Sequence, residues 1–72
     1  MNAADWKIVE CDIHEGYYQN SIWVRYDGMD GWDCICRYYP DELSYTKDEF
    51  IGKTRLEARE LIHRKDVEYL RS

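Results

Sequence analysis

The sequence predicts a single small α+β domain over residues 1–72. A three- to four-stranded antiparallel sheet would be followed by one C-terminal helix packed on one face, in the order β-β-β-(β)-α. Three runs of alternating apolar and polar residues, separated by turn residues, indicate half-buried strands in the first forty positions. A capping motif before apolar residues at helical spacing indicates a helix in the last twenty. One helix laid on one sheet is the layered arrangement available to a single small core.

Each predicted strand has two faces of different polarity, because successive side chains point to opposite sides. In the first, residues 6–14, the drier face is expected to consist of Lys7, Val9, Cys11 and Ile13. In the second, residues 22–26, one face carries Ile22, Val24 and Tyr26, opposite Trp23 and Arg25. In the third, residues 32–39, one face carries Trp32, Cys34, Cys36 and Tyr38, opposite Asp33, Ile35, Arg37 and Tyr39.

Turn-forming residues separate these strands. Residues 27–31 contain two Gly and two Asp, the composition of a four- or five-residue hairpin loop. Pro40 ends the third strand because proline cannot donate a hydrogen bond to a ladder. Residues 44–51 alternate only weakly, so the sequence leaves open whether they form a short edge strand or an extended segment.

The helix is predicted over residues 55–70. After Gly52, the pair Thr54 and Glu57 has the spacing of a reciprocal capping box. At about 100° per residue, one broad apolar face carries Ala58, Leu61, Ile62 and Tyr69. A second apolar group consists of Leu56, Val67 and Leu70. The helix is therefore expected either to bend near residues 65–66 or to offer a second apolar stripe to a partner.

Charge is split along the chain. Residues 1–52 carry eleven acids and four bases, a net charge of −7, whereas residues 53–72 carry six bases and four acids, a net charge of +2. The total of −5 argues against nucleic acid as a partner, because phosphate recognition depends on clustered Lys and Arg. It favours a partner with a basic surface.

Cysteine usage and hydropathy indicate the compartment. Three Cys cannot form a complete disulfide framework, which favours a reducing environment. No apolar run approaches the roughly 20 residues of a membrane span, and the first residues lack the pattern of a signal peptide. We therefore expect a cytoplasmic protein without membrane contact.

A chain this short buries only roughly 60% of its unfolded surface, so we expect modest stability, or stability shared with a partner.

The Cys and His residues do not have the spacing typical of zinc sites. Cys34 and Cys36, with Cys11, His14 and His63 elsewhere, supply the thiols and imidazoles that zinc prefers. Their spacing differs from the usual C-x-x-C turn, so we interpret the three Cys as small core residues. The sequence does not decide whether they bind a metal.

A calcium site is not expected either. Asp27, Asp30 and Asp33 lack the regular ligand spacing of a calcium loop and suit a solvated hairpin tip.

Catalysis is also not expected. Ser21, Ser44 and Thr46 have no recognisable activating neighbour, so the sequence predicts no catalytic residue, no cofactor and no enzyme activity.

Aromatic and acidic residues are instead the candidates for a binding surface. Tyr outnumbers Phe seven to one, and Tyr and Trp are enriched at protein interfaces. Strand propensity alone is the equal alternative explanation for these tyrosines. We expect the acidic segments and the exposed aromatic rings to lie together on one patch. The negative electrostatic field of this patch would attract and bind a basic surface. The predicted partner-binding residues are Asp27, Asp30, Asp33, Asp41, Glu42, Trp23, Tyr39 and Tyr45.

The predicted function is that of a small acidic, tyrosine-rich module that blocks a basic surface on a larger protein. Its size and charge are of the type found among phage and mobile-element inhibitors, including DNA mimics and anti-CRISPR proteins, an analogy with no matching residues. One alternative is a structural homodimer or assembly protein that pairs through a strand edge or the second helix stripe. Another is a weak nucleic-acid binder that uses the basic residues of the C-terminal helix.

Overall fold

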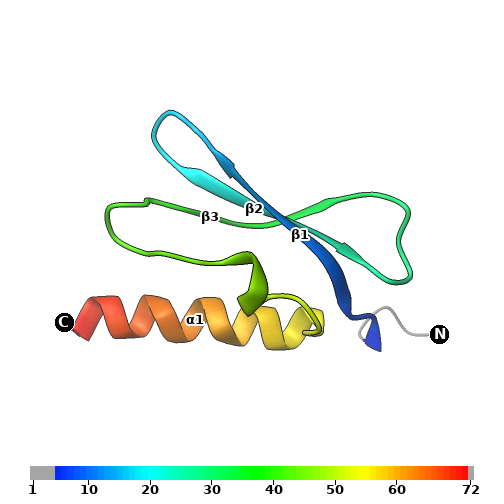
Figure 1. The fold of residues 1–72 in the computed structure, drawn as a ribbon. Helices are drawn as coiled ribbons and strands as arrows, with labels where there is room; N and C mark the ends of the chain where they lie inside the picture. The colour runs from blue at the N-terminus through cyan, green and yellow to red at the C-terminus, as the bar shows by residue number, and fades with distance from the viewer. Residues whose placement is uncertain (1–4, 72) are drawn as a thin grey trace.

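The protein is a three-stranded antiparallel sheet with one long helix along one side of it (Figure 1). The computed structural model describes residues 5–71. The strands are β1 (Ile8–Glu15), β2 (Asn20–Tyr26) and β3 (Asp33–Tyr38), paired in the order β1-β2-β3. A 3₁₀ helix, η2 (Lys47–Glu49), precedes the helix α1 (Arg55–Arg71). The predicted α+β fold is confirmed.

Residues 44–51 do not form a strand. They contain η2, and both Tyr45 and Phe50 are buried, with 6% and 0% of their surface exposed. A strand would point these two side chains to opposite faces because they are five residues apart. The turn at η2 instead lets both enter the core, which explains why the alternation in this segment is weak.

The chain returns to the sheet briefly before α1. Gly52 has a φ of +85°, a conformation that glycine adopts without steric cost. Its N–H donates to the carbonyl of Ile8 at 2.8 Å, and the N–H of Ile8 donates to the carbonyl of Lys53 at 2.8 Å. This short pairing at the start of β1 anchors the loop that leads into α1.

Two β-bulges change the predicted strand faces. In β1 the register shifts between Ile8 and Glu10, so Ile8 is buried while Val9 is exposed, the reverse of the prediction. The alternate residues Cys11 and Ile13 still face the core side, as expected. Each bulge adds one residue to one strand, and every side chain before it changes face relative to those after it.

The second bulge separates the two cysteines of β3. Ile22 pairs with Cys36 and Trp23 pairs with Cys34, so Ile35 is the extra residue. Cys36 packs against the core, whereas Cys34 belongs to the other face of the sheet, opposite Trp23. The prediction of one shared face for Trp32, Cys34, Cys36 and Tyr38 is therefore wrong, and so is the core assignment of Cys34.

The core lies between the sheet and a second layer made by residues 43–50 and α1. β2 supplies its centre as predicted: Ile22, Val24 and Tyr26 are all buried. The other buried residues are Ile8, Cys11, Tyr38, Tyr45, Phe50, Ala58 and Leu61.

The β2–β3 connection is the predicted hairpin loop. The N–H of Met29 donates to the carbonyl of Tyr26 at 3.0 Å, which closes the turn. A Cβ atom on Gly28 would lie 2.2 Å from the ring of Trp6, so only glycine allows this ring to pack on the loop. The composition of residues 27–31 therefore serves both the turn and the packing of the N-terminal segment.

The capping box predicted for α1 is present. The N–H of Thr54 donates to Oε1 of Glu57 at 3.0 Å, and the N–H of Glu57 donates to Oγ1 of Thr54 at 3.3 Å. This backbone hydrogen bond is the main reason that the pKa of Glu57 lies below its ordinary value. Two of the N–H groups that lack a partner in any first helical turn are thereby satisfied.

One lysine joins the middle of α1 to the segment beneath the sheet. Nζ of Lys65 lies 2.6 Å from Oε2 of Glu49 and donates to the carbonyl of Ser44 at 2.6 Å. It also lies 4.4 Å from the centre of the Tyr45 ring, in the geometry of a cation–π contact. Burial is the main cause that raises the pKa of Tyr45 far above its ordinary range.

The helix is continuous, so the second apolar stripe exists. Ala58 and Leu61 are buried on the core side. On another side of the helix, Leu56 and Leu70 expose 65% and 79% of their surface, and Val67 is partly exposed. Of the two outcomes expected from the sequence, the structure has the stripe and not a break in the helix.

Candidate functional site

The face of the sheet turned away from the core is the candidate binding surface. In the part of the chain that the structure describes, α1 and residues 43–50 lie on one side of the sheet, and no further element covers the other (Figure 1). We call this the open face. The strand register assigns to it Glu10, Asp12, His14, Ser21, Trp23, Arg25, Cys34 and Arg37.

Two tryptophans border a hollow on the open face. Asp12, His14, Trp23 and Trp32 line a hollow of about 350 Å³, which we call the Trp hollow. Trp32 exposes 46% of its surface, whereas Trp23 is half-buried. Large apolar rings around a shallow depression are typical of the anchor positions of protein interfaces.

One of the two indole rings of the Trp hollow, that of Trp23, is held by neighbouring polar groups. Nε1 of Trp23 donates to Oγ of Ser21 at 3.0 Å, and the centroids of the Trp23 and His14 rings are 6.0 Å apart. A side chain held in this way loses little conformational entropy when a partner covers it.

A short polar chain forms one wall of the Trp hollow. Nε2 of His14 lies 2.8 Å from Oδ2 of Asp12, and Nζ of Lys47 lies 3.5 Å from Oδ1 of the same carboxylate. The hydrogen bond from His14 is the main cause that lowers the pKa of Asp12. The carboxylate therefore stays ionised at neutral pH and supplies a negative charge beside the rings.

An ion pair extends the open face along β1 and β2. Nη2 of Arg25 lies 3.1 Å from Oε1 of Glu10, and Nη1 donates to the carbonyl of Met29 at 3.3 Å. The hydrogen bond from Arg25 is the main cause that lowers the pKa of Glu10. The exposed pair adds little stability, but it orients the Arg25 side chain on the open face.

The tip of the β1–β2 hairpin carries two further rings. Tyr17 and Tyr18 are almost fully exposed, and their centroids lie 4.6 Å apart in an edge-to-face arrangement. Rigid, exposed tyrosines contribute contact area at low entropic cost. They confirm that some of the tyrosines reach the surface.

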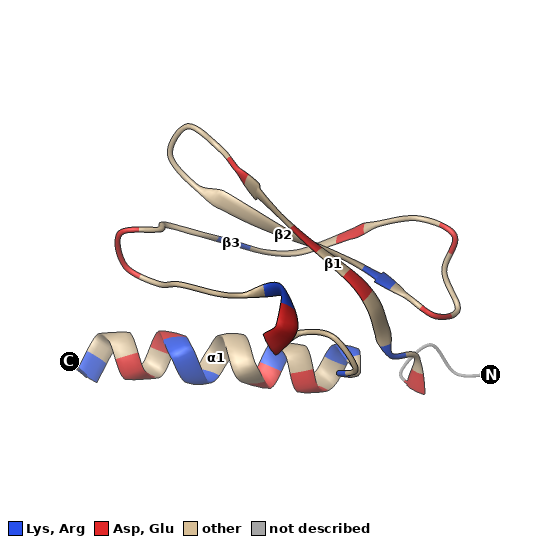
Figure 2. Cartoon of the chain, in the orientation of Figure 1, with Lys and Arg blue, Asp and Glu red and all other residues tan. Residues whose placement is uncertain are grey.

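The acidic residues predicted to form one patch lie at two opposite ends of the molecule. Asp27 and Asp30 lie in the β2–β3 loop, whereas Asp41 and Glu42 lie in the loop that follows β3 (Figure 2). Asp27 also has a structural role, because its Oδ1 accepts from the N–H of Lys7 at 3.3 Å. The predicted convergence of these charges on a single patch is therefore wrong.

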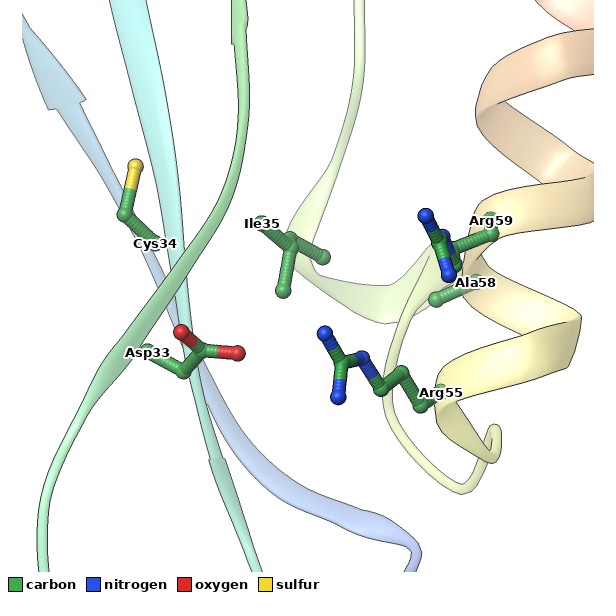
Figure 3. Close-up of a pocket in the computed structure, with 6 residues that line it drawn as sticks. All are labelled: Asp33, Cys34, Ile35, Arg55, Ala58 and Arg59. Atoms are coloured by element: carbon green, nitrogen blue, oxygen red, sulfur yellow. The ribbon is translucent and has the colours of Figure 1, made fainter. Parts of the chain in front are cut away.

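The other predicted partner-binding residues are separated as well. Trp23 lies on the open face, Tyr39 is half-exposed beside the Asp41 loop, and Asp33 points from β3 toward α1 (Figure 3). Tyr45 is buried, with its ring centroid 4.9 Å from that of Tyr38 and 5.7 Å from that of Phe50. It belongs to the core and cannot contact a partner in this fold, because the turn at η2 directs it inward.

Sequence reasoning missed Asp12, His14 and Trp32 as site residues. The sequence indicates His14 only as a possible zinc ligand and places Trp32 on a strand face. The alternation of Asp12 and His14 with the core residues Cys11 and Ile13 was the available signal, because it places the two polar side chains on one face.

The described residues contain no group of three or more His, Cys, Asp or Glu side chains that could hold a metal ion. All three cysteines are free, and burial is the main cause that raises the pKa of both Cys11 and Cys36. Both thiols are therefore protonated at neutral pH.

Within residues 5–71, no helix has both the length and the apolar character needed to cross a membrane. No protein-family model, curated protein or solved structure matches this chain.

Proposed function

We propose that this protein is a non-catalytic binding module that docks through its open face onto a larger protein with a basic surface. The observation that carries the proposal is the Trp hollow, because the exposed ring of Trp32 and the half-buried ring of Trp23 border it on a face that no described element covers. Interface energy is concentrated in such anchors, with Trp, Tyr and Arg the most enriched types. Trp23, Arg25 and Trp32 supply two of these types.

The charge of the protein supports a basic partner. The chain carries a net charge of −5, and the acidic loops lie at both ends of the molecule, beyond the two ends of the sheet (Figure 2). In this arrangement the rings supply affinity at the centre while the carboxylates attract the partner from a distance. A module of this kind inhibits by occupancy, because it covers a basic surface that otherwise holds another ligand such as nucleic acid.

The substitution Trp32→Ala tests the anchor. A central Trp contributes roughly 2 kcal/mol or more to binding, so the affinity is expected to fall by roughly thirtyfold. Leu56→Ala is the matched control, because it removes an exposed apolar side chain from the helix, away from the open face. A pull-down from the native host identifies the partner as the protein that binds to wild type and to Leu56→Ala but not to Trp32→Ala. An affinity of the purified partner for Trp32→Ala equal to that for wild type contradicts the proposal.

Charge reversal tests the role of the acidic loops. Asp30→Lys and Glu42→Lys each change one exposed loop, one at either end of the molecule. Each is expected to slow association by up to about tenfold at low salt and to flatten its salt dependence. Glu60→Lys makes the same charge change on α1 and is expected to slow association less. Unchanged association rates in both loop variants at low salt rule out steering by these loops.

Self-association is the second candidate function, and the exposure of Leu56 and Leu70 favours it. The apolar stripe that these residues form with Val67 would be covered by the same stripe of a second copy. Sedimentation equilibrium at micromolar concentration measures this directly. A dimer that Leu70→Glu dissociates and Trp32→Ala leaves intact supports self-association through the stripe, whereas a monomeric wild type rules it out.

The placement of the bases on α1 gives less support to nucleic-acid binding. Lys65 pairs with Glu49 and the carbonyl of Ser44, so its charge is used inside the protein. Arg55 and Arg59 point toward the sheet (Figure 3). These bases therefore do not form a continuous outward stripe on α1 that could follow a phosphate backbone.

A further inference from the structure

The Trp hollow combines aromatic rings with a carboxylate. Three of its four lining residues, His14, Trp23 and Trp32, supply rings, and the fourth, Asp12, supplies the carboxylate. The face of an indole ring attracts a cation more strongly than the face of any other aromatic side chain. A carboxylate beside the rings adds a second attraction for positive charge. The volume of about 350 Å³ lies at the small end of the range for ligand pockets, which suits one side chain of a partner.

The carboxylate of Asp12 keeps both its charge and part of its hydrogen-bonding capacity. The hydrogen bond from His14 lowers its pKa, and this bond requires no charge on His14, because a neutral imidazole also donates through an N–H group. Lys47 contacts the other carboxylate oxygen at 3.5 Å, in a surface ion pair whose lysine side chain is 60% exposed. A carboxylate has about four acceptor sites, so these two contacts leave room for a further donor.

The cations of the chain leave the two indole rings uncovered. Within residues 5–71, no Lys or Arg side chain makes a cation–π contact with Trp23 or Trp32. Arg25 shares the open face with them, but Oε1 of Glu10 and the carbonyl of Met29 hold its guanidinium group. The hollow is therefore open to a cation that a partner supplies.

The same combination of groups holds a cation elsewhere in the protein. The ammonium group of Lys65 lies 4.4 Å from the centre of the Tyr45 ring and 2.6 Å from Oε2 of Glu49. That contact joins a ring, a carboxylate and a cation on the core side of the sheet. The Trp hollow has the ring and the carboxylate on the open face, with two indole rings in place of one phenol ring. A cation from a partner would complete the same arrangement there.

We propose that the Trp hollow receives an arginine side chain of the basic partner, with its guanidinium group against the indole rings and hydrogen-bonded to the carboxylate of Asp12. This inference rests on the proposed function, because it names the group that the partner places on the open face. Arginine suits the hollow better than lysine, because a guanidinium group is planar, stacks on aromatic faces and is more weakly hydrated than an ammonium group. It therefore loses less hydration when it enters a hollow lined mainly by rings.

NMR titration of the whole protein with blocked amino acids tests the hollow without the partner. The probe is N-acetylarginine amide, and N-acetylcitrulline amide is its uncharged counterpart of similar shape; both are added at constant ionic strength. We expect the arginine probe to cause saturable shifts in the indole Nε1–H signals of Trp23 and Trp32. N-acetyllysine amide should bind more weakly, and the citrulline probe should cause no saturable shift. Trp6 is the internal reference, because its ring packs on the loop at Gly28, outside the hollow.

Substitutions separate the contributions of the ring and the charge. Trp32→Leu keeps an apolar side chain but removes the ring, and it is expected to weaken binding of the arginine probe by roughly tenfold. Trp32→Phe should lose less, because a smaller ring face remains. Asp12→Asn is expected to weaken binding by roughly fivefold. Glu15→Gln makes the same charge change on the opposite side of β1 and is expected to leave the affinity nearly unchanged.

Three results would overturn the inference. The first is the absence of a saturable response to the arginine probe, and the second is an equal response to the citrulline probe. The third is an equal loss of affinity in Asp12→Asn and Glu15→Gln, which would assign the response to net charge. None of these results contradicts the proposed function, because a partner held by apolar contact alone would still lose affinity for Trp32→Ala. The proposed function fails instead if the purified partner binds Trp32→Ala as tightly as wild type, whatever the probe does.

Discussion

The two faces of the sheet are made by the same three strands, yet they use their side chains in different ways. The covered face contributes only apolar side chains and tyrosines to the core, and the described residues include no buried charged side chain. The open face holds the ion pair of Glu10 with Arg25 and the hydrogen bond of His14 with Asp12, beside the half-buried Trp23. The difference indicates that one face supplies the stability of this small domain and leaves the other available for contact.

The largest expected effect is on the covered face. Phe50→Ala empties a fully buried site between η2 and the sheet and is expected to lower the free energy of unfolding by about 3–5 kcal/mol. A loss of this size is a large fraction of the total stability of a small domain. Urea denaturation, monitored by circular dichroism, measures this loss of unfolding free energy.

Trp32→Ala is the matched substitution on the open face. It also removes a large ring, but from a partly exposed position, so the expected loss of unfolding free energy is within about 1 kcal/mol. If Trp32→Ala destabilised the domain as much as Phe50→Ala, the open face would be part of the core and the division between the two faces would fail.

The next effect concerns how α1 is attached to the covered face. Lys65→Met removes the contacts with Glu49, Ser44 and the ring of Tyr45 but keeps a long apolar side chain. We expect a loss of about 1–2 kcal/mol from the ion pair and the cation–π contact together. Arg64→Met, on the exposed side of the helix, is the control and is expected to change stability by at most about 0.5 kcal/mol. The measurement is the midpoint temperature of thermal unfolding of the two variants. Equal midpoints would show that the contacts of Lys65 do not stabilise the packing of the helix.

The features that depend on neighbours in sequence were predictable. The faces of β2, the loop at residues 27–31 and the capping box of Thr54 and Glu57 all follow from local spacing, and the structure has each of them. The bulges at Val9 and Ile35 were not predictable, because an extra residue is defined only against the strand opposite it. One displaced residue in each strand was enough to reverse the faces of Ile8 and Cys34.

The candidate site was less predictable than the fold for the same reason. Trp23 was assigned to the face opposite Ile22 and Val24 from alternation alone, and that assignment is correct. Its neighbours in space come from β1 and from the residue before β3, so the Trp hollow depends on strand pairing. The predicted acidic patch failed because Asp30 and Asp41 lie in loops at opposite ends of β3, whose length separates them.

A smaller effect is expected at the start of α1. Thr54→Ala removes the hydroxyl that accepts from the N–H of Glu57, and the loss of such a cap costs about 1 kcal/mol. Thr54→Ser keeps the acceptor and is expected to retain most of the stability. Amide hydrogen exchange in residues 55–58 provides the local measurement, because fraying of the first turn speeds exchange there. Equal exchange in the two variants would contradict a role for the cap.

The smallest expected effect is a difference between the two faces in how pH changes their contribution to the free energy of unfolding. In the folded protein, hydrogen bonds from Arg25, His14 and the N–H of Thr54 hold the pKa values of Glu10, Asp12 and Glu57 below their ordinary values of 4.5, 3.8 and 4.5. A carboxyl group whose pKa is lower in the folded than in the unfolded state contributes stability that is complete above the unfolded pKa. That stability is lost as the pH falls through the folded pKa. Acid should therefore weaken the open face and the helix cap, whereas the described core has no buried charged group to titrate.

Urea denaturation between neutral pH and about pH 3 tests this expectation. The free energy of unfolding is expected to be level above about pH 5 and to decline below it. Glu10→Gln should make the decline shallower, because this variant no longer has a proton to bind at the pair with Arg25. Glu15→Gln, at the exposed end of the same strand, makes an equal change in charge and is the control. A decline of the same steepness in both variants would mean that acid acts through net charge alone and that the Glu10–Arg25 pair does not make the open face sensitive to pH.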